Sequence, residues 1–279
     1  MFLPTSLQQL ELGEAFNQSI EDVKFPASLQ QLELGEAFNQ PIEDVEFPAS
    51  LQQLIIGGHS WFDQPIAGAI LPSALRVLAL GQDFNHPIKD VAWPSSLQQL
   101  TFGQLFNMPI EEVVWPASLE ELSFGAEFNQ PIEGVSWPDS LQRLAFEHDF
   151  NQPVDNVRWP ASLQGLTFGW WGGDGDGSTW MQSNFNQRIG MSAWPASLRR
   201  LTLGGKNFRQ SLQGLGTWIP NLEIFHLLVW DANDAPNDSL LRGIEWPKGL
   251  RHLTVFQDSN LDGAVIPSTV EVLYAYNES

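Results

Sequence analysis

The sequence predicts a repeat solenoid that is mainly β, with one parallel β-sheet and little α-helix. A leucine-initiated motif recurs along most of the chain with a period of 22 residues. Within each copy, apolar and polar residues alternate with period two, as in a strand with one buried face. Prolines recur in the copies, and no copy has an apolar helical pattern of useful length. We therefore expect about twelve right-handed, leucine-rich-repeat-like coils of about 22 residues each.

The copies share the pattern L-x-x-L-x-[LF]-G-x-x-F-N-x-P-I-x-x-V-x-[FW]-P-x-S. Residues 7–28 and 29–50 differ only at Ser19/Pro41 and Lys24/Glu46. The positions that open the copies are Leu7, Leu29, Leu51, Leu75, Leu97, Leu119, Leu141, Leu163, Leu198, Leu222, Leu250 and Val270. Intervals longer than 22 residues indicate insertions.

Each part of the motif has a physical role, which the second copy illustrates. Leu32 and Leu34 are expected to point into the core from a short strand, so that Gln31 and Glu33 point outward. The glycine after the strand permits a turn conformation, and the Asn after the Phe that recurs in each copy bonds backbone groups at a corner. One copy cannot bury its apolar face alone, so the copies must stack.

The domain organisation follows from the spacing of the copies. Residues 1–279 are predicted to form a single solenoid domain, with regular repeats over 1–210 and degenerate repeats over 211–279. An insertion at 170–182 interrupts the regular part. At two corners Asp63 and Arg209 replace the Asn, and we expect both to weaken the corner locally. A partner or further sequence is expected to cover the terminal coils, because an open solenoid end exposes its core.

Composition narrows the choice of partners. The chain carries 33 Asp and Glu against 13 Lys and Arg, a formal net charge of −20. This charge disfavours nucleic acid and anionic membranes and favours a basic protein partner, although acidity also keeps a Trp-rich protein soluble. Without cysteine, the chain has no disulfide and no thiol chemistry. No signal peptide or transmembrane segment is evident, so the compartment is unknown and cytoplasmic by default.

The recurring F-N-x-P-I core of the motif resembles the FNIP repeat, a relative of the leucine-rich repeat. The resemblance is close over 1–210 and loose over 211–279, and the P-x-S-L entry is also similar to the short repeats of bacterial leucine-rich proteins. It implies protein interaction through the strand face and brings no catalytic residues. We therefore expect a non-catalytic scaffold that needs no cofactor and that can form a subunit of a larger assembly.

Two outward columns on the strands are the predicted partner-binding surface, because solenoids typically bind through this face. The predicted contact residues are Glu11, Glu33, Gln31, Gln53, Gln99, Glu121, Arg143 and Arg200. A purely structural face would tolerate the same variation along the columns. Threonines at 101, 167, 202 and 254 raise ice binding as another use, but Ser, Ala and His interrupt them. The column of tryptophans before the second proline is expected to be core, because Phe25, Phe47 and Leu71 occupy equivalent positions.

The 170–181 insertion is the second predicted site. Trp170, Trp171 and Trp180 are candidate anchors for a partner, or they cover the flank of the solenoid. Asp174 and Asp176 lie in a D-G-D-G-S run that resembles the start of a calcium loop, without the EF-hand Gly and Glu at the later places. A carbohydrate- or calcium-binding module using 170–181 is therefore the alternative function. Elsewhere, His226 and His252 are expected on neighbouring strands, two residues out of step and without an obvious third metal ligand.

Overall fold

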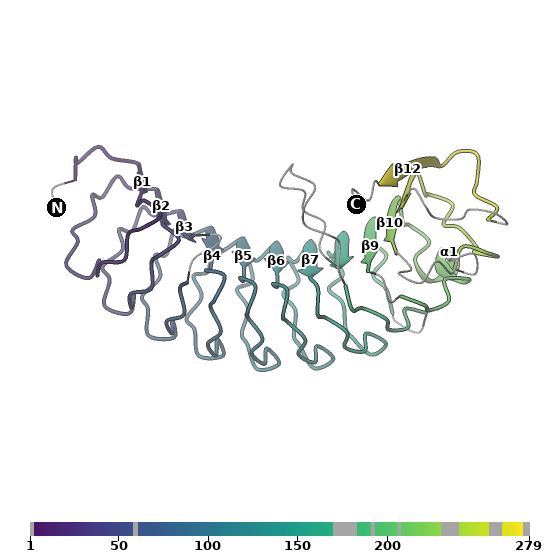
Figure 1. The fold of residues 1–279 in the computed structure, drawn as a ribbon, viewed down its shortest axis with the longest axis horizontal. Coiled ribbons are helices and arrows are strands. Elements are labelled where there is room, and N and C mark those ends of the chain that lie inside the picture. The colour runs from purple at the N-terminus through teal and green to yellow at the C-terminus, as the bar shows by residue number, and fades with distance from the viewer. Residues whose placement is uncertain are drawn as a thin grey trace. The chain divides into compact units, whose positions relative to one another are not determined.

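The computed structural model describes residues 3–57, 61–169, 183–190, 193–205, 208–229, 240–256 and 264–275. The described residues form twelve short strands, which follow one another in chain order in a parallel sheet (Figure 1). In the described part, the only helix is the single turn α1 (Leu215–Trp218). These features confirm the predicted solenoid with one parallel sheet and little helix. The chain divides into two compact units, Met1–Gln130 and Pro131–Ser279.

The first unit contains six strands of three or four residues each. They are β1 (Gln9–Glu11), β2 (Gln31–Leu34), β3 (Gln53–Ile56), β4 (Val77–Ala79), β5 (Gln99–Thr101) and β6 (Glu121–Ser123). Each strand pairs with the next in register, so that Leu10 lies opposite Leu32, and Leu32 opposite Leu54. The 22-residue period therefore places the same motif position side by side in neighbouring coils.

The described part of the second unit also contains six strands. They are β7 (Arg143–Phe146), β8 (Gly165–Phe168), β9 (Arg200–Gly204), β10 (Ile224–Leu228), β11 (His252–Phe256) and β12 (Glu271–Ala275). The register is kept across the longest interval, because Leu166 in β8 lies opposite Leu201 in β9. The insertion therefore adds residues between two coils without displacing the strands on either side.

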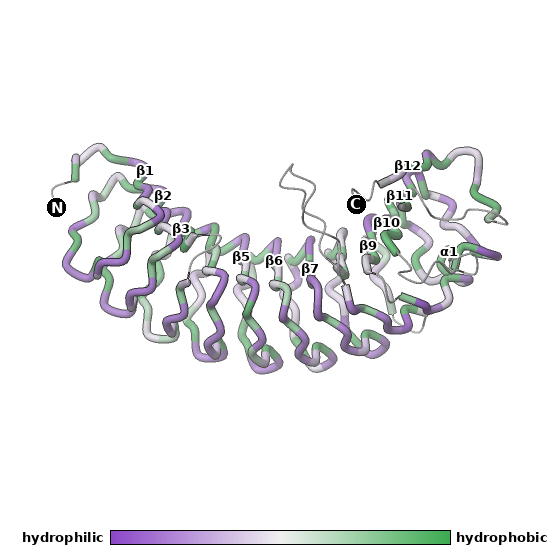
Figure 2. The backbone as a smooth tube through the Cα atoms, in the orientation of Figure 1, coloured by the Kyte–Doolittle hydropathy of each residue, from purple (hydrophilic) through white to green (hydrophobic). Residues whose placement is uncertain are grey.

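A column of phenylalanines forms the centre of the core in the first unit. Phe38, Phe62, Phe84, Phe106 and Phe128 have no exposed surface. Successive rings in this column stack with centroids 6.0 to 6.2 Å apart. Every coil carries polar as well as apolar residues (Figure 2). No coil could bury its Phe alone, so the stack of like residues accounts for the need for many copies.

Asparagines at the corners form a ladder of hydrogen bonds from coil to coil. The backbone N–H of Asp63 donates to Asn39 Oδ1 at 3.0 Å, and that of Asn85 donates to Asp63 Oδ1 at 3.1 Å. The expectation that Asp63 weakens the corner is therefore wrong, because a carboxylate oxygen accepts the same bond as the amide oxygen. Arg209 N–H still donates to Asn186 Oδ1 at 2.9 Å, but an Arg side chain has no acceptor with which to continue the ladder.

Serines of the P-x-S-L entry form a second ladder, for which the sequence reasoning gave no role. In most coils the Ser hydroxyl donates to the carbonyl of the opening Leu one coil earlier, as Ser118 does to Leu97 at 2.6 Å. Ser50, Ser96, Ser162 and Ser197 do the same. Ala74 occupies the equivalent position in one coil and supplies no hydroxyl.

In three coils of the first unit, the glycine after the strand is needed for a reason other than the predicted turn conformation. In the first unit, a Cβ added at Gly35, Gly103 or Gly125 would lie only 2.2, 2.1 or 1.9 Å from a carbonyl oxygen of the preceding coil. Among the described glycines, positive φ angles occur at Gly169, Gly205 and Gly243, and the first two directly follow β8 and β9, where they adopt the predicted turn conformation. Close approach between coils, rather than a left-handed turn, therefore requires glycine at 35, 103 and 125.

Candidate functional site

The strand face of the first unit carries two rows of side chains that the register aligns across β1 to β6. One row is Gln9, Gln31, Gln53, Val77, Gln99 and Glu121, and the other is Glu11, Glu33, Ile55, Ala79, Thr101 and Ser123. The residues predicted as contacts in this unit thus lie in two adjacent rows. Gln99 Nε2 donates to Glu121 Oε1 at 3.1 Å, so neighbours within a row also bond to one another. Carboxylates are the only charged groups in these rows.

The corresponding rows of the second unit are basic and neutral except for Glu271 at the end of one row. One contains Arg143, Gly165, Arg200, Ile224, His252 and Glu271, and the other contains Ala145, Thr167, Thr202, His226, Thr254 and Leu273. Arg143 and Arg200 are both exposed. The Arg143 side chain leans across Gly165, because its Cγ lies 3.6 Å from the place a Cβ would take there. The glycine therefore leaves room for an exposed guanidinium over the sheet.

His226 has the most strongly shifted pKa among the basic side chains of these rows. Its Nδ1 lies 2.9 Å from Thr254 Oγ1 in the next strand. Burial, with smaller effects from Arg200 and His252, lowers the pKa of His226 to about 4, so the imidazole is neutral at pH 7. His252 instead pairs with Glu271, with Nδ1 and Oε2 3.0 Å apart. The predicted two-residue offset of the two histidines is confirmed, since His226 lies opposite Thr254.

Two threonines on the strand face of the second unit are not available to a partner. Thr202 and Thr254 are 3% and 4% exposed, although the alternation of the motif predicted outward-facing, accessible positions. Contact on this face therefore depends on the row of Arg143 and Arg200. Among the residues that the structure describes, no group of three His, Cys, Asp or Glu side chains is placed to hold a metal ion.

The predicted insertion site lies outside the described residues. This applies to Trp170, Trp171 and Trp180 as well as to the candidate calcium ligands Asp174 and Asp176. Their roles stay predictions.

Glu147 is a residue that the sequence reasoning missed. It follows β7 at the position where the other regular coils have glycine, and it is half-buried. Desolvation by burial raises the pKa of Glu147 from 4.5 to about 7. Beside it, His148 Nδ1 lies 2.6 Å from Asp149 Oδ1, which also accepts a bond from Asn184 Nδ2 at 2.9 Å. The break in the glycine column is the signal that would have identified this carboxyl.

The tryptophan column packs as core, as the sequence predicted. Trp115, Trp137 and Trp159 are 7% to 8% exposed, and the rings of Trp93 and Trp115 stack with centroids 6.4 Å apart. These three rings leave no flat surface on which a sugar ring could stack, whereas Trp93, Trp194 and Trp246 are half-buried.

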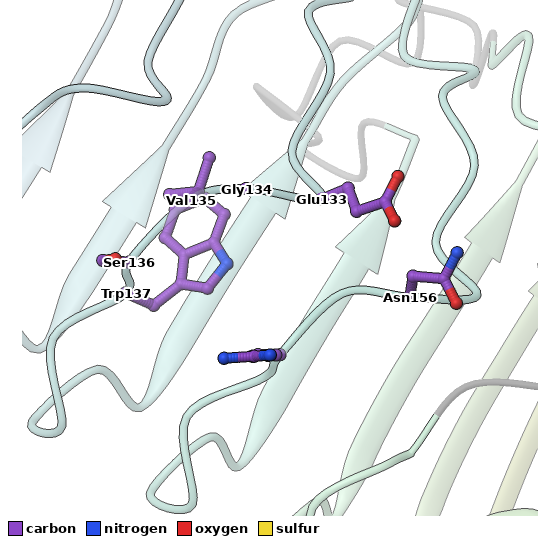
Figure 3. Close-up of a pocket in the computed structure, with 7 residues that line it drawn as sticks. Glu133, Gly134, Val135, Ser136, Trp137 and Asn156 are labelled. Carbon is purple, nitrogen blue, oxygen red and sulfur yellow. The ribbon is translucent and has the colours of Figure 1, made fainter.

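An open groove of about 830 Å³ lies between two coils of the second unit (Figure 3). Trp137 lies at one end and Glu133 and Asn156 at the other, with Ser136 and Arg158 also lining the groove. The exposed Arg158 has no hydrogen bond or ion pair to any described residue. The groove is open and lined mostly by polar groups, so it is suited to weak polar contact rather than to enclosure of a ligand.

Comparison with protein families gives four matches to the FNIP Repeat model, which together span more than half of the chain. They cover residues 16–59, 62–105, 84–127 and 128–170. Among curated protein sequences, none matches significantly. In the described part of the chain, no helix has the length and apolar character needed to cross a membrane.

Solved structures show the same architecture. CroV588, described as a circular leucine-rich-repeat protein, is 35% identical with a TM-score of 0.78, and the match covers 98% of this chain. The chain spans only 37% of the length of CroV588. YopM from Yersinia enterocolitica is 18% identical with a TM-score of 0.53, over 99% of this chain and 57% of YopM. The internalin InlF from Listeria monocytogenes is 14% identical with a TM-score of 0.50, over 96% and 87%. The last two similarities concern the fold alone.

Proposed function

Because this chain belongs to the FNIP repeat family, we propose that it is a non-catalytic scaffold that binds a protein partner through its strand face. Leucine-rich-repeat-like folds are commonly used for protein interaction. The observation that carries the proposal is the register, which aligns equivalent outward side chains of successive strands into rows. Rows of this kind offer one extended surface on which many weak contacts add up.

Charge supports a choice of partner for the first unit. Its rows contain Glu11, Glu33 and Glu121 among glutamines, without a basic side chain. A basic segment would pair with these carboxylates, while the Gln amides would donate to and accept from its backbone. In the second unit, Arg143 and Arg200 fit an acidic group on the same partner or on another one.

A catalytic role is not proposed. Repeats of this family and similar leucine-rich solenoids are typically scaffolds rather than enzymes. The two groups with strongly shifted pKa values, Glu147 and His226, belong to coils three strands apart in the second unit. Three strand spacings amount to about 14 Å, too far for direct proton transfer between them.

Charge reversal on the strand face tests the proposal. Glu11, Glu33 and Glu121 are changed together to Lys, and protein captured from a lysate of the source is compared with that captured by the wild type. The matched control changes Glu14, Glu36 and Glu127 to Lys, because these exposed acids lie beyond the strands and give the same change of net charge. We expect a partner that the wild type and the control retain and the strand-face variant loses. Retention of every partner by the strand-face variant would refute the proposed surface.

The 170–181 insertion supports the alternative, a carbohydrate- or calcium-binding module. Its Trp-rich and D-G-D-G-S sequence is the reason to test it. Calcium titration calorimetry and a glycan array, each run on the full chain and on a 170–181 deletion, decide the matter. Binding that disappears on deletion supports the module, whereas absence of calcium and glycan binding by the full chain contradicts it.

A further inference from the structure

An exposed row of side chains lies at one motif position outside the strands, the x of V-x-[FW], between the buried Val and the Trp or Phe. In three consecutive coils of the first unit this position is apolar: Ile70, Ala92 and Val114. Ile70 and Val114 are 79% and 81% exposed, and Ala92 is exposed as well. Other coils have Lys24, Glu46, Ser136, Arg158 and Glu245 at the same position. The fold therefore does not require an apolar residue here.

The three residues, which we name the apolar row, are neighbours in space. The turn that precedes each of them is closed by the same backbone bond, such as Ala69 N–H to Ile66 O at 3.1 Å and Val113 N–H to Ile110 O at 3.2 Å. In the first two coils, Lys24 Nζ and Glu46 Oε2 meet at this position, 2.7 Å apart. Long side chains at this position therefore reach from one coil to the next, so the position is adjacent in successive coils.

Exposed carboxylates lie beside the apolar row, in the two positions between the Ile and the Val of the motif. These residues, the acidic row, are Glu43, Asp44, Asp90, Glu111 and Glu112. The Glu43 carboxyl leans toward the coil of Ile70, since its Oε1 lies 3.1 Å from the place a Cβ would take at Gly68. Lys89 is the cation at these positions in the same coils, and it pairs with Glu112 at 2.5 Å.

We propose that the apolar row and the acidic row together bind an amphipathic helix that carries Lys or Arg beside its apolar stripe. Beside the apolar row, the rings of Trp93 and Trp115 in successive coils are 6.4 Å apart. One helical turn rises about 5.4 Å, so each coil meets about one turn of a helix lying along the row. Apolar side chains of the helix cover Ile70, Ala92 and Val114, while its cations face the carboxylates. This surface is separate from the strand face and does not depend on the proposed function.

Synthetic peptides of about 18 residues test the proposal by fluorescence anisotropy at physiological salt. The probe has Leu along one helical face and Lys beside it. A second peptide replaces the Lys with Glu, and a third scrambles the first so that its charge is kept and its apolar face is lost. The protein variant Ile70→Ser/Val114→Ser adopts the residue found at Ser136, so the coil tolerates it. Its matched control is Val265→Ser, because Val265 is 85% exposed and lies elsewhere.

We expect the Leu/Lys probe to bind the wild type and the Val265→Ser control equally, and the double Ser variant at least about tenfold more weakly. The Glu and scrambled peptides should bind the wild type at least about tenfold more weakly than the probe. A second variant, Asp90→Asn/Glu111→Gln, neutralises two carboxylates of the acidic row, and Glu14→Gln/Glu36→Gln is its control with the same change of net charge. Weaker binding of the probe to the first of these variants than to the control assigns the charge contact to the acidic row. Equal binding of the probe to the wild type and the double Ser variant would overturn the proposal, as would failure of the probe to bind the wild type. The peptide result does not depend on the charge-reversal experiment on the strand face, because the two experiments change different surfaces.

Discussion

Replacement of Glu147 by Gln should make the stability of the protein less dependent on pH. In the folded protein, burial keeps this carboxyl protonated up to a pKa of about 7, whereas in the unfolded chain it ionises near its ordinary value of 4.5. The folded state therefore binds the proton more tightly. The resulting stabilisation is fully present below pH 4.5 and is lost as the pH rises through 7.

The magnitude follows from the pKa difference. One pKa unit corresponds to about 1.4 kcal/mol, so a pKa of about 7 against 4.5 gives about 3 kcal/mol of unfolding free energy between pH 4 and pH 8. Gln keeps the size and hydrogen-bonding groups of a protonated Glu but cannot ionise. The variant should thus match the wild type near pH 4 and exceed its stability by roughly 2 to 3 kcal/mol at pH 8.

Urea unfolding followed by circular dichroism at pH 4, 5, 6, 7 and 8 measures this difference. Because the chain has many carboxylates, only the difference between wild type and Glu147→Gln at each pH is informative. Glu147→Gly, which restores the residue of the other coils, is a second comparison and should likewise remove the dependence. A constant difference between Glu147→Gln and the wild type from pH 4 to pH 8 would refute the reasoning.

Three further predictions concern the imidazole, the ladder and the core. The folded pKa of His226 is about 4 against an ordinary 6.5, so its stabilisation is present above pH 6.5 and is lost as the pH falls through 4. Because solvent screens this half-buried ring, His226→Gln should remove about 1 to 2 kcal/mol of this acid sensitivity in urea titrations. Asn107→Ala removes the acceptor for the backbone N–H of Asn129 and should cost about 1 to 3 kcal/mol in urea unfolding, whereas Asn107→Asp, which imitates Asp63, should cost less. Phe128→Ala should cost about 3 to 5 kcal/mol by the same measurement, since this ring is fully buried; a loss below about 1 kcal/mol would contradict the stacked-core model.

The strands and their rows were predictable because a strict period fixes both. Once Leu10, Leu32 and Leu54 are recognised as equivalent, parallel pairing in register places their outward neighbours side by side. The contacts between coils were less predictable. The role of Gly35 depends on a distance to the preceding coil, and the role of Ser118 on a carbonyl one coil away, neither of which a single copy reveals.

For the candidate sites, the sequence likewise predicted the position of residues in the sheet but not their exposure. Gln31, Glu33 and Arg200 were assigned to the strand face from alternation alone, and the register places them in its rows. Thr202 occupies an outward position of the same alternation but is buried, so the alternation along one strand does not determine the exposure of its side chains. Glu147 and the apolar row are visible as breaks in columns of the sequence, yet their meaning depends on exposure, which the repeat pattern does not report.

The two ladders have a consequence for how such a chain can change in length. The Asn and Ser side chains donate and accept at fixed offsets between neighbouring coils, so a coil copied whole brings both halves of its own junctions. Duplication of 22 residues would leave every existing bond with an equivalent partner, whereas insertion of a few residues into a strand would break the pairing on both sides. The near-identity of residues 7–28 and 29–50 is what a duplication of this kind leaves behind. Selection can therefore act on the length of the solenoid one coil at a time, and on the outward side chains of each new coil afterwards.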